Sequence, residues 1–349
     1  MKRLSVEASL HRYLDRYLLP VPTARRIWVT KLSVRQSQTR EHPTSTKTQI
    51  HFASQHDLLQ SANMDIPVHV VEPLSAHTHT VVFLHGRGDN APNFAASLRF
   101  SRTSADLTLF QALPSFRWVF PQARRGNVPA RRPCGRSVCP PPSAAGGASA
   151  DHGGCKGFDV WNVGDFAERE ELQAEGLKEV VPALRRVLAA EAARLGGRWD
   201  KVVLAGISMG GATSAHILFN LDVPGPRPRL AAFLGFSCRC PFAGRALADM
   251  RAVLHLDAVP GHPEVVRNTP VLLEHCGDDP LVLVGSGRGL RDTLVEFGAS
   301  VEWREYPAGG HWFNATTGMD DVVEFVKRAV EPSVEGEGTT VEASEMDLS

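Results

Sequence analysis

Short runs of β-branched and apolar residues alternate with longer stretches of helical periodicity between residues 66 and 330. Several of the short runs are apolar at consecutive positions, which is typical of strands covered on both faces. The alternation predicts an α/β fold in a single domain, with a mostly parallel central sheet and helices on both faces. The predicted strands span residues 68–71, 80–84, 117–120, 201–205, 230–235, 271–274 and 301–306.

Four longer stretches place apolar residues close to the helical period. In the first stretch, Leu177, Leu184 and Leu188 fall on one face of such a helix. Pro182 lies inside it, so we expect a break or a kink there. The predicted helices span residues 168–195, 211–221, 286–297 and 320–330.

Three segments lie outside this alternation. Residues 126–157 have almost no large apolar side chains and predict a disordered insertion, although a retained intron in the gene model explains them equally well. Residues 1–65 predict a basic extension mostly outside the core, and residues 331–349 predict an acidic disordered tail. The folded body is therefore expected within residues 66–330.

The charged residues are distributed unevenly, and both ends of the chain differ in charge from the middle. The 349 residues carry 38 Lys+Arg and 38 Asp+Glu, yet residues 1–50 hold ten basic and three acidic residues, and residues 331–349 hold six acidic residues and no Lys or Arg. The neutral sum argues against a protein that grips phosphate backbones, so we expect no nucleic-acid partner. The basic N-terminus fits a mitochondrial presequence, an unstructured extension or a misplaced start codon. No apolar run reaches the roughly 18–20 residues that span a bilayer, so we expect a cytoplasmic protein without a transmembrane segment.

The six cysteines form neither a disulfide framework nor a metal-ligand pattern. Cys134, Cys139 and Cys155 lie in a Pro/Gly-rich stretch, and Cys238 and Cys240 are spaced too tightly for a zinc knuckle. We therefore expect free thiols, no metal site and no cofactor.

The sharpest chemical signal is the run Gly206-Ile207-Ser208-Met209-Gly210. It follows the apolar residues 202–205 and precedes the small residues 211–215, which open a predicted helix. A Gly-x-Ser-x-Gly run between a strand and a helix is the setting of a nucleophile elbow, where glycines let two backbone segments approach closely. An ordinary glycine-rich turn is the simpler alternative. The run nominates Ser208 as a nucleophile.

A serine hydroxyl needs a base to remove its proton and an acid to orient that base. In an elbow fold these partners follow the serine in the order acid, then histidine, each after a later strand. Asp278 and Asp279 follow the sixth predicted strand, and His311 follows the seventh on a Gly-rich loop. Neighbouring residues point in different directions, so only one of the two aspartates is expected to reach His311. His275 is predicted to be a packed, satisfied imidazole.

The same chemistry needs hydrogen-bond donors for a developing oxyanion. The glycine-rich turn at residues 84–89, Leu84-His85-Gly86-Arg87-Gly88-Asp89, ends an early strand and is suited to presenting a backbone N–H. The second donor is expected to be the N–H of Met209, the residue after the nucleophile. His85 is predicted to have a structural place in the turn.

In these residues the chain resembles the phospholipase/carboxylesterase family of α/β-hydrolases, which includes the acyl-protein thioesterases, over roughly residues 66–330. The motifs that carry the resemblance are residues 84–89, Phe120-Pro121, Phe158-Asp159-Val160-Trp161, residues 206–211, Asp279-Pro280-Leu281-Val282 and Gly310-His311. The runs at residues 238–241 and 287–292 are more similar to the fungal branch of the family.

The resemblance implies a catalytic triad of Ser208, Asp279 and His311, and this favours Asp279 over Asp278. It also implies that the backbone N–H groups of Arg87 and Met209 form the oxyanion hole. The family more often has Leu and Gln at these two positions, but a backbone donor depends little on the side chain it carries.

The implied function is that of a metal-free serine hydrolase. It would cleave a fatty-acyl thioester or a carboxylic ester through an acyl-enzyme, with S-acylated proteins among the candidate substrates. Phe158, Trp161 and Trp312 are the expected substrate-binding residues. The alternatives are a non-catalytic α/β-hydrolase-fold binding module and an inactive product of a mis-spliced gene model.

Overall fold

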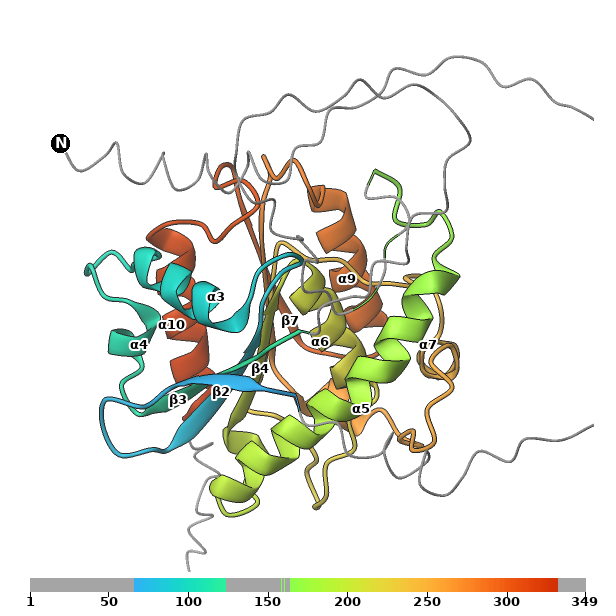
Figure 1. Ribbon diagram of the computed structural model, residues 1–349, viewed down its shortest axis with the longest axis horizontal. Coiled ribbons are helices and arrows are strands. Elements are labelled where there is room, and N and C mark those ends of the chain that lie inside the picture. Colours follow the sequence, from blue (N-terminus) through green and yellow to red (C-terminus); the bar gives the residue numbers. More distant parts are fainter. Residues whose placement is uncertain (1–65, 124–157, 159, 161–163, 332–349) are drawn as a thin grey trace, which may run out of the picture. The chain divides into compact units, whose positions relative to one another are not determined.

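The computed structural model describes residues 66–123, 158, 160 and 164–331. They form a seven-stranded sheet of order β1-β3-β2-β4-β5-β6-β7 (Figure 1). β1 runs antiparallel to β3, and the other neighbouring strands are parallel. The strands are β1 (Val68–Val71), β2 (His79–Leu84), β3 (Phe116–Pro121), β4 (Val202–Ile207), β5 (Ala232–Phe236), β6 (Val271–Cys276) and β7 (Val301–Tyr306). The prediction of a mostly parallel α/β sheet is confirmed.

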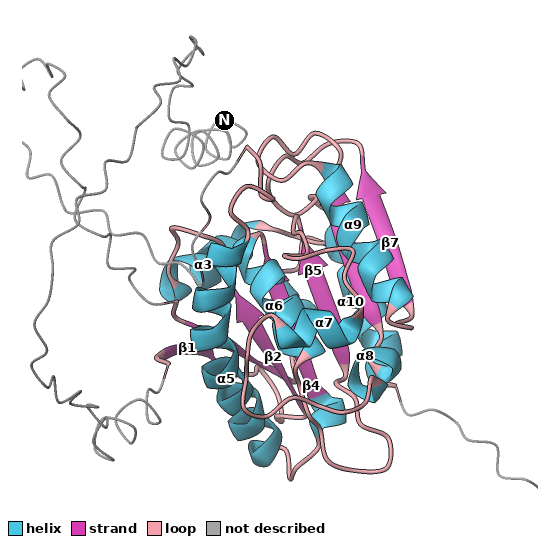
Figure 2. Ribbon diagram, turned by 90° about the vertical axis from the view of Figure 1, so that its right-hand side faces the viewer, coloured by secondary structure: helices cyan, strands magenta, loops and turns pink. Residues whose placement is uncertain are grey.

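Helices cover both faces of the sheet (Figure 2). One face carries α5 (Glu171–Arg194), α6 (Met209–Phe219), α7 (Leu247–Ala252), α8 (Glu264–Asn268) and α9 (Val284–Glu296). The other carries α3 (Ala91–Ser97), α4 (Leu109–Ala112) and α10 (Thr317–Val330). Short 3-10 turns, η1 (Leu98–Phe100) and η2 (Trp199–Lys201), follow α3 and precede β4.

The central strand β4 shows why the sheet needs both layers. Val202 and Leu204 lie in the apolar cluster under α5 and α6, whereas Val203 and Ala205 lie in the cluster under α3 and α10. All four side chains are buried. Burying each Val or Leu contributes about 1.5–3 kcal/mol, so a consecutive apolar run is stable only between two helix layers.

Of the break or kink expected at Pro182, the break is wrong, because α5 runs without interruption through that residue, and a kink stays a prediction. Proline removes one backbone N–H and leaves the carbonyl of the residue four positions earlier without its helical partner. That residue is Lys178, which is exposed. Water can therefore satisfy the carbonyl, and packing of Leu177, Leu184 and Leu188 keeps the helix together.

The periodicity missed the short helices α3, α4, α7 and α8, which have too few turns to display it. α3 begins instead with a local signal: the side chain of Asn90 accepts a hydrogen bond from the N–H of Asn93. α4 begins with a capping box between Thr108 and Gln111. Local capping side chains therefore determine where α3 and α4 begin.

The helices and strands of the described residues lie inside the predicted folded body of residues 66–330. The predictions for residues 1–65, 126–157 and 332–349 fall outside the described residues, as do Cys134, Cys139 and Cys155. Cys238, Cys240 and Cys276 are free and buried. Within the described ranges, no helix is both long and apolar enough to cross a membrane.

Candidate active site

The predicted site residues lie at one edge of the sheet. Ser208 directly follows β4, Asp279 follows β6, His311 follows β7, and Arg87 lies in the turn after β2. These four strands belong to the parallel part of the sheet, so their carboxyl ends meet at the same edge. The fold thus collects residues that are more than two hundred positions apart in the chain.

The turn at Ser208 has the strained shape of a nucleophile elbow. Ser208 has φ 55° and ψ −124°, a backbone region that costs a non-glycine residue about 1–3 kcal/mol. Its N–H donates to the carbonyl of Phe236 at 2.9 Å. A Cβ on Gly206 would lie 2.5 Å from the backbone of Gly210, and one on Gly210 would lie 2.5 Å from the carbonyl oxygen of His85. The two glycines are therefore needed because backbone segments touch here.

The turn after β2 lies against the nucleophile. A Cβ built on Gly86 would be 3.4 Å from Ser208 Cβ and 3.9 Å from Ser208 Oγ. Within the described residues, the N–H groups of Arg87 and Met209 donate to no protein acceptor, and both residues line one cavity. Met209 is also the first residue of α6, whose N-terminus carries partial positive charge. This arrangement favours an anion beside Ser208.

His311 and Asp279 form a buried pair. His311 Nδ1 lies 2.8 Å from Asp279 Oδ2, and the two residues are 7% and 3% exposed. Asp279 Oδ1 accepts the N–H groups of Leu281 at 2.9 Å and Val282 at 3.0 Å. An ionised carboxylate only accepts, so Nδ1 of His311 carries the hydrogen and Nε2 is left as the basic atom.

The charge of Asp279 is set by opposing effects. Burial alone would raise the pKa of Asp279, but the hydrogen bonds from His275 and His311 and the backbone N–H of Val282 hold this pKa well below its usual value. The carboxylate therefore stays ionised at neutral pH and keeps its acceptor role.

Asp278 has a different partner. Its Oδ1 accepts the N–H of Gly310 at 2.7 Å, and its Oδ2 accepts the N–H of Gly309 at 3.3 Å. Asp279 thus contacts the imidazole of His311 while Asp278 fixes the backbone just before it. The family resemblance favoured Asp279 over Asp278 as the partner of His311, and the contact of Asp278 with the backbone before His311 was not foreseen from the sequence.

His275 is buried and hydrogen-bonded, as the sequence predicted. Its Nε2 lies 2.7 Å from the carbonyl oxygen of Val282. The same atom is 3.4 Å from Asp279 Oδ2, a contact that the sequence did not reveal. His275 thereby supports both the carboxylate and the short turn that holds it.

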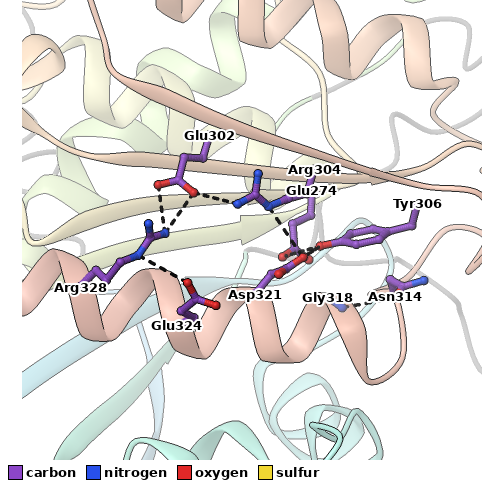
Figure 3. Close-up of polar contacts among 9 residues, drawn as sticks. All are labelled: Glu274, Glu302, Arg304, Tyr306, Asn314, Gly318, Asp321, Glu324 and Arg328. Carbon is purple, nitrogen blue, oxygen red and sulfur yellow. Dashed lines mark hydrogen bonds and ion pairs between the residues drawn. The ribbon is translucent and has the colours of Figure 1, made fainter.

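A polar cluster anchors the strands below the loop at residues 307–316, which carries His311 (Figure 3). Tyr306 Oη lies 2.6 Å from Asp321 Oδ2 on α10 and 3.2 Å from Glu274 Oε1 on β6. Burial raises the pKa of Glu274 well above its usual value. The hydroxyl of Tyr306 is the donor in both contacts, so its single hydrogen is shared between Asp321 and Glu274. The cluster ties β6, β7 and α10 together, and no sequence motif signalled it.

Ser208 and His311 are linked through packing. Within the described residues no hydrogen bond joins their side chains directly. The ring of Phe313, two residues after His311, packs 4.8 Å from the ring of Phe236, whose register partner Ile207 precedes Ser208. The base loop therefore rests on the strand beside the elbow. Bonds between nucleophile and base are often long until substrate binds.

The three predicted substrate-binding residues have different outcomes. Trp312 donates its indole N–H to Ser101 Oγ at 3.0 Å and packs against Phe94. Phe158 is 3% exposed, with the guanidinium of Arg239 5.8 Å from its ring centre. Trp161 lies outside the described residues. A substrate-binding role for all three stays a prediction.

Cys276 is a buried thiol near His311, since its Sγ lies 3.8 Å from the carbonyl oxygen of Trp312. Burial and neighbouring carboxylates raise the pKa of Cys276 to about 12, so it remains a neutral thiol. Among the residues that the structure describes, no group of three or more His, Cys, Asp or Glu could hold a metal ion. Ser208, His311 and Asp279 lie at this edge of the sheet, and their role as a triad stays a prediction.

Comparisons with known proteins agree with this architecture. The family model described as Phospholipase/Carboxylesterase matches residues 153–330. Acyl-protein thioesterase 1 of Neurospora crassa is 26% identical over 251 residues, covering 70% of this chain and 84% of that protein. Carboxylesterase SOBER1 of Arabidopsis thaliana is 24% identical over 233 residues, covering 66% and 82%.

Solved structures share the fold. The crystal structure of Zea mays acyl-protein thioesterase 2 has a TM-score of 0.52 at 22% identity, covering 76% of this chain and 99% of that chain. The crystal structure of esterase PE8 has a TM-score of 0.53 at 21% identity, covering 76% and 100%.

The sheet, its two helix layers and these neighbours define an α/β-hydrolase enzyme of the esterase and thioesterase class. Within that class, the chain belongs to the phospholipase/carboxylesterase family. The family resemblance in the sequence, including its similarity to fungal members, is confirmed.

Proposed function

We propose that the chain is a serine hydrolase that cleaves a fatty-acyl thioester or carboxylic ester with a triad of Ser208, His311 and Asp279. The observation that carries this proposal is the 2.8 Å contact between His311 Nδ1 and Asp279 Oδ2, at the same sheet edge as the strained Ser208 turn. That contact leaves Nε2 of His311 as the only ring atom free to accept a proton.

In the proposed reaction, Ser208 Oγ attacks the carbonyl carbon as its proton passes to His311 Nε2. The N–H groups of Arg87 and Met209 stabilise the oxyanion of the tetrahedral intermediate. His311 then gives the proton to the leaving thiol or alcohol, and an acyl-enzyme on Ser208 remains. Water attacks the acyl-enzyme by the same route, with His311 again as the base, and releases the acid.

Apolar surroundings support an acyl substrate. The cavity that Arg87 and Met209 line also has Val180 and Leu184 of α5 in its wall. The similarity to proteins named acyl-protein thioesterase 1 supports thioesters, and the similarity to a protein named carboxylesterase supports oxyesters. S-acylated proteins and a cytoplasmic location are the finer parts of this proposal.

The test is the Ser208→Ala variant assayed with a short p-nitrophenyl ester and a fluorophosphonate probe. We expect turnover and labelling to be abolished, because removal of a triad nucleophile leaves only the small contribution of binding and the oxyanion hole. Ser214→Ala on the same helix is the matched control, since its hydroxyl only donates to the carbonyl of Ala205.

Persistent labelling of Ser208→Ala would refute the proposed nucleophile, and a wild-type protein that never labels would favour a non-catalytic binding module. A panel of a palmitoyl thioester, a lysophospholipid and short aryl esters then separates the substrate classes.

A further inference from the structure

His85 lies in the turn at residues 84–89, beside the nucleophile, and both of its ring nitrogens make hydrogen bonds. Its Nδ1 lies 2.8 Å from the carbonyl oxygen of Gly86. Its Nε2 lies 3.2 Å from the backbone nitrogen of Ala123, which follows β3. The side chain is 6% exposed, so these two contacts account for its polar atoms without solvent.

The two contacts fix the hydrogen on His85. The backbone N–H of Ala123 is a donor, so Nε2 must be the unprotonated, accepting nitrogen. Nδ1 therefore carries the hydrogen and donates it to the carbonyl of Gly86. Burial lowers the pKa of His85, which keeps this neutral form through the physiological range.

The carbonyl of Gly86 and the N–H of Arg87 belong to one peptide group. In a trans peptide the two bonds are coplanar and point in opposite directions, and the structure has no cis peptide among its described residues. A hydrogen bond that fixes the carbonyl on one side therefore fixes the N–H on the other. The neighbouring Gly86 lies in contact range of Ser208, which places this peptide beside the nucleophile.

We propose that His85 is the positioning residue for the oxyanion hole: its Nδ1–H aims the N–H of Arg87 at the oxyanion, and the N–H of Ala123 selects the tautomer that does so. This role rests on the proposed function, because it presumes an oxyanion formed on Ser208. The role extends the support of the proposed oxyanion hole to Ala123, which follows β3.

Three substitutions separate the two hydrogen bonds of His85. In His85→Asn the amide nitrogen can take the place of Nδ1 and keep the donor to Gly86. In His85→Gln the amide oxygen can take the place of Nε2 and keep the acceptor for Ala123, but the donor is lost. His85→Ala loses both. We expect kcat to fall by about 10- to 100-fold in His85→Gln and His85→Ala, with KM little changed, because one oxyanion donor is misaimed. His85→Asn should recover most of the loss.

Measuring the concentration of active sites distinguishes a positioning role of His85 from a loss of correctly folded protein. Titration with a fluorophosphonate gives the concentration of competent Ser208, so kcat is calculated per labelled site. Affinity for a trifluoromethyl ketone, which forms a tetrahedral adduct with serine, should fall by the same factor as kcat/KM. His79→Gln is the matched control, since His79 begins the same strand at its opposite end and stacks on Phe116.

Unchanged kcat per labelled site in His85→Gln would overturn the inference, as would equal losses in His85→Asn and His85→Ala. Nitrogen-15 NMR of histidine in the wild-type protein gives a second test without a variant, because an Nε2–H tautomer of His85 contradicts the inference. Failure of the wild type to label at Ser208 overturns the proposed function itself, and is therefore a separate outcome.

Discussion

The two halves of the site are built on different principles. The proposed nucleophile half, from β2 and β4, is held by backbone contact: Gly210 lets the elbow touch the end of β2, Gly206 lets β4 touch the start of α6, and the proposed oxyanion donors are backbone N–H groups. The proposed acid–base half, from β6 and β7, is held by hydrogen bonds that the side chains of Asp278 and Asp279 accept.

This difference predicts which kind of substitution disrupts each half of the site. A half made of touching backbone tolerates no added atoms, since a new methyl group has nowhere to go. A half made of side-chain hydrogen bonds is sensitive to the loss of a charge or of an acceptor. The elbow is therefore tested by adding a methyl group, and the acid–base half by removing a charge.

Adding a methyl group at the elbow should have the largest effect. In Gly210→Ala the new Cβ would overlap the carbonyl oxygens of Leu84 and His85, which are backbone atoms at the end of β2 and not the flexible ends of side chains. We expect loss of fluorophosphonate labelling and a loss of more than about 3 kcal/mol in the free energy of unfolding, measured in urea. Gly289→Ala on α9 is the control, because a Cβ there meets open space, and it should gain about 0.5–1 kcal/mol. A stable and active Gly210→Ala would contradict the steric account.

Removing the charge of each aspartate in turn should show which of the two contributes more to kcat. Asp279→Asn removes the acceptor that fixes the tautomer of His311, and a loss of about 10⁴-fold in kcat is expected. Asp278→Asn keeps one acceptor for Gly310 and loses only the 3.3 Å contact to Gly309, so a loss of about 3- to 10-fold is expected. The measurement is kcat per labelled site for both variants with one ester. Equal losses would mean that the assignment of the acid is wrong.

The cluster under the His311 loop should give the smallest effect, seen mainly in stability. Because the pKa of Glu274 is raised in the folded state, the unfolded chain releases this proton first as pH rises above about 4.5. Wild-type stability is therefore lost with rising pH through this group. Glu274→Gln imitates the protonated form and should become more stable than the wild type between pH 5 and pH 8, in thermal or urea unfolding. No difference in pH dependence between the two proteins would show that Glu274 is ionised in the fold.

Local patterns in the sequence predicted much of the fold and of the candidate site. Consecutive apolar residues such as Val202–Ala205 predicted strands buried on both faces, and β1 and β7 begin and end at their predicted residues. The run at residues 206–210 predicted the elbow because only glycine allows such close backbone contact at a strand–helix turn. The order of serine, acid and histidine along the chain followed from the fold class.

Long-range geometry could not be read in the same way. Pro182 did not break α5, because packing along the buried face outweighed the local preference. The roles of Asp278 and His275 depend on the path of two loops that meet only in the folded chain. In the sequence, Glu274 is a single polar residue after the apolar residues 271–273. Its partners, Tyr306 on β7 and Asp321 on α10, lie later in the chain, so no local pattern indicates their contact.

The sequence by itself determined the α/β class, the family and the residue types expected at the site, because these depend on local periodicity and on motifs a few residues long. Tertiary structure alone decided what Asp278 contacts, which tautomer His85 adopts and what supports the loop that carries His311. These depend on hydrogen bonds between strands that are neighbours in the sheet but distant in the chain, and hydrogen-bond direction is set by distances of a few tenths of an ångström.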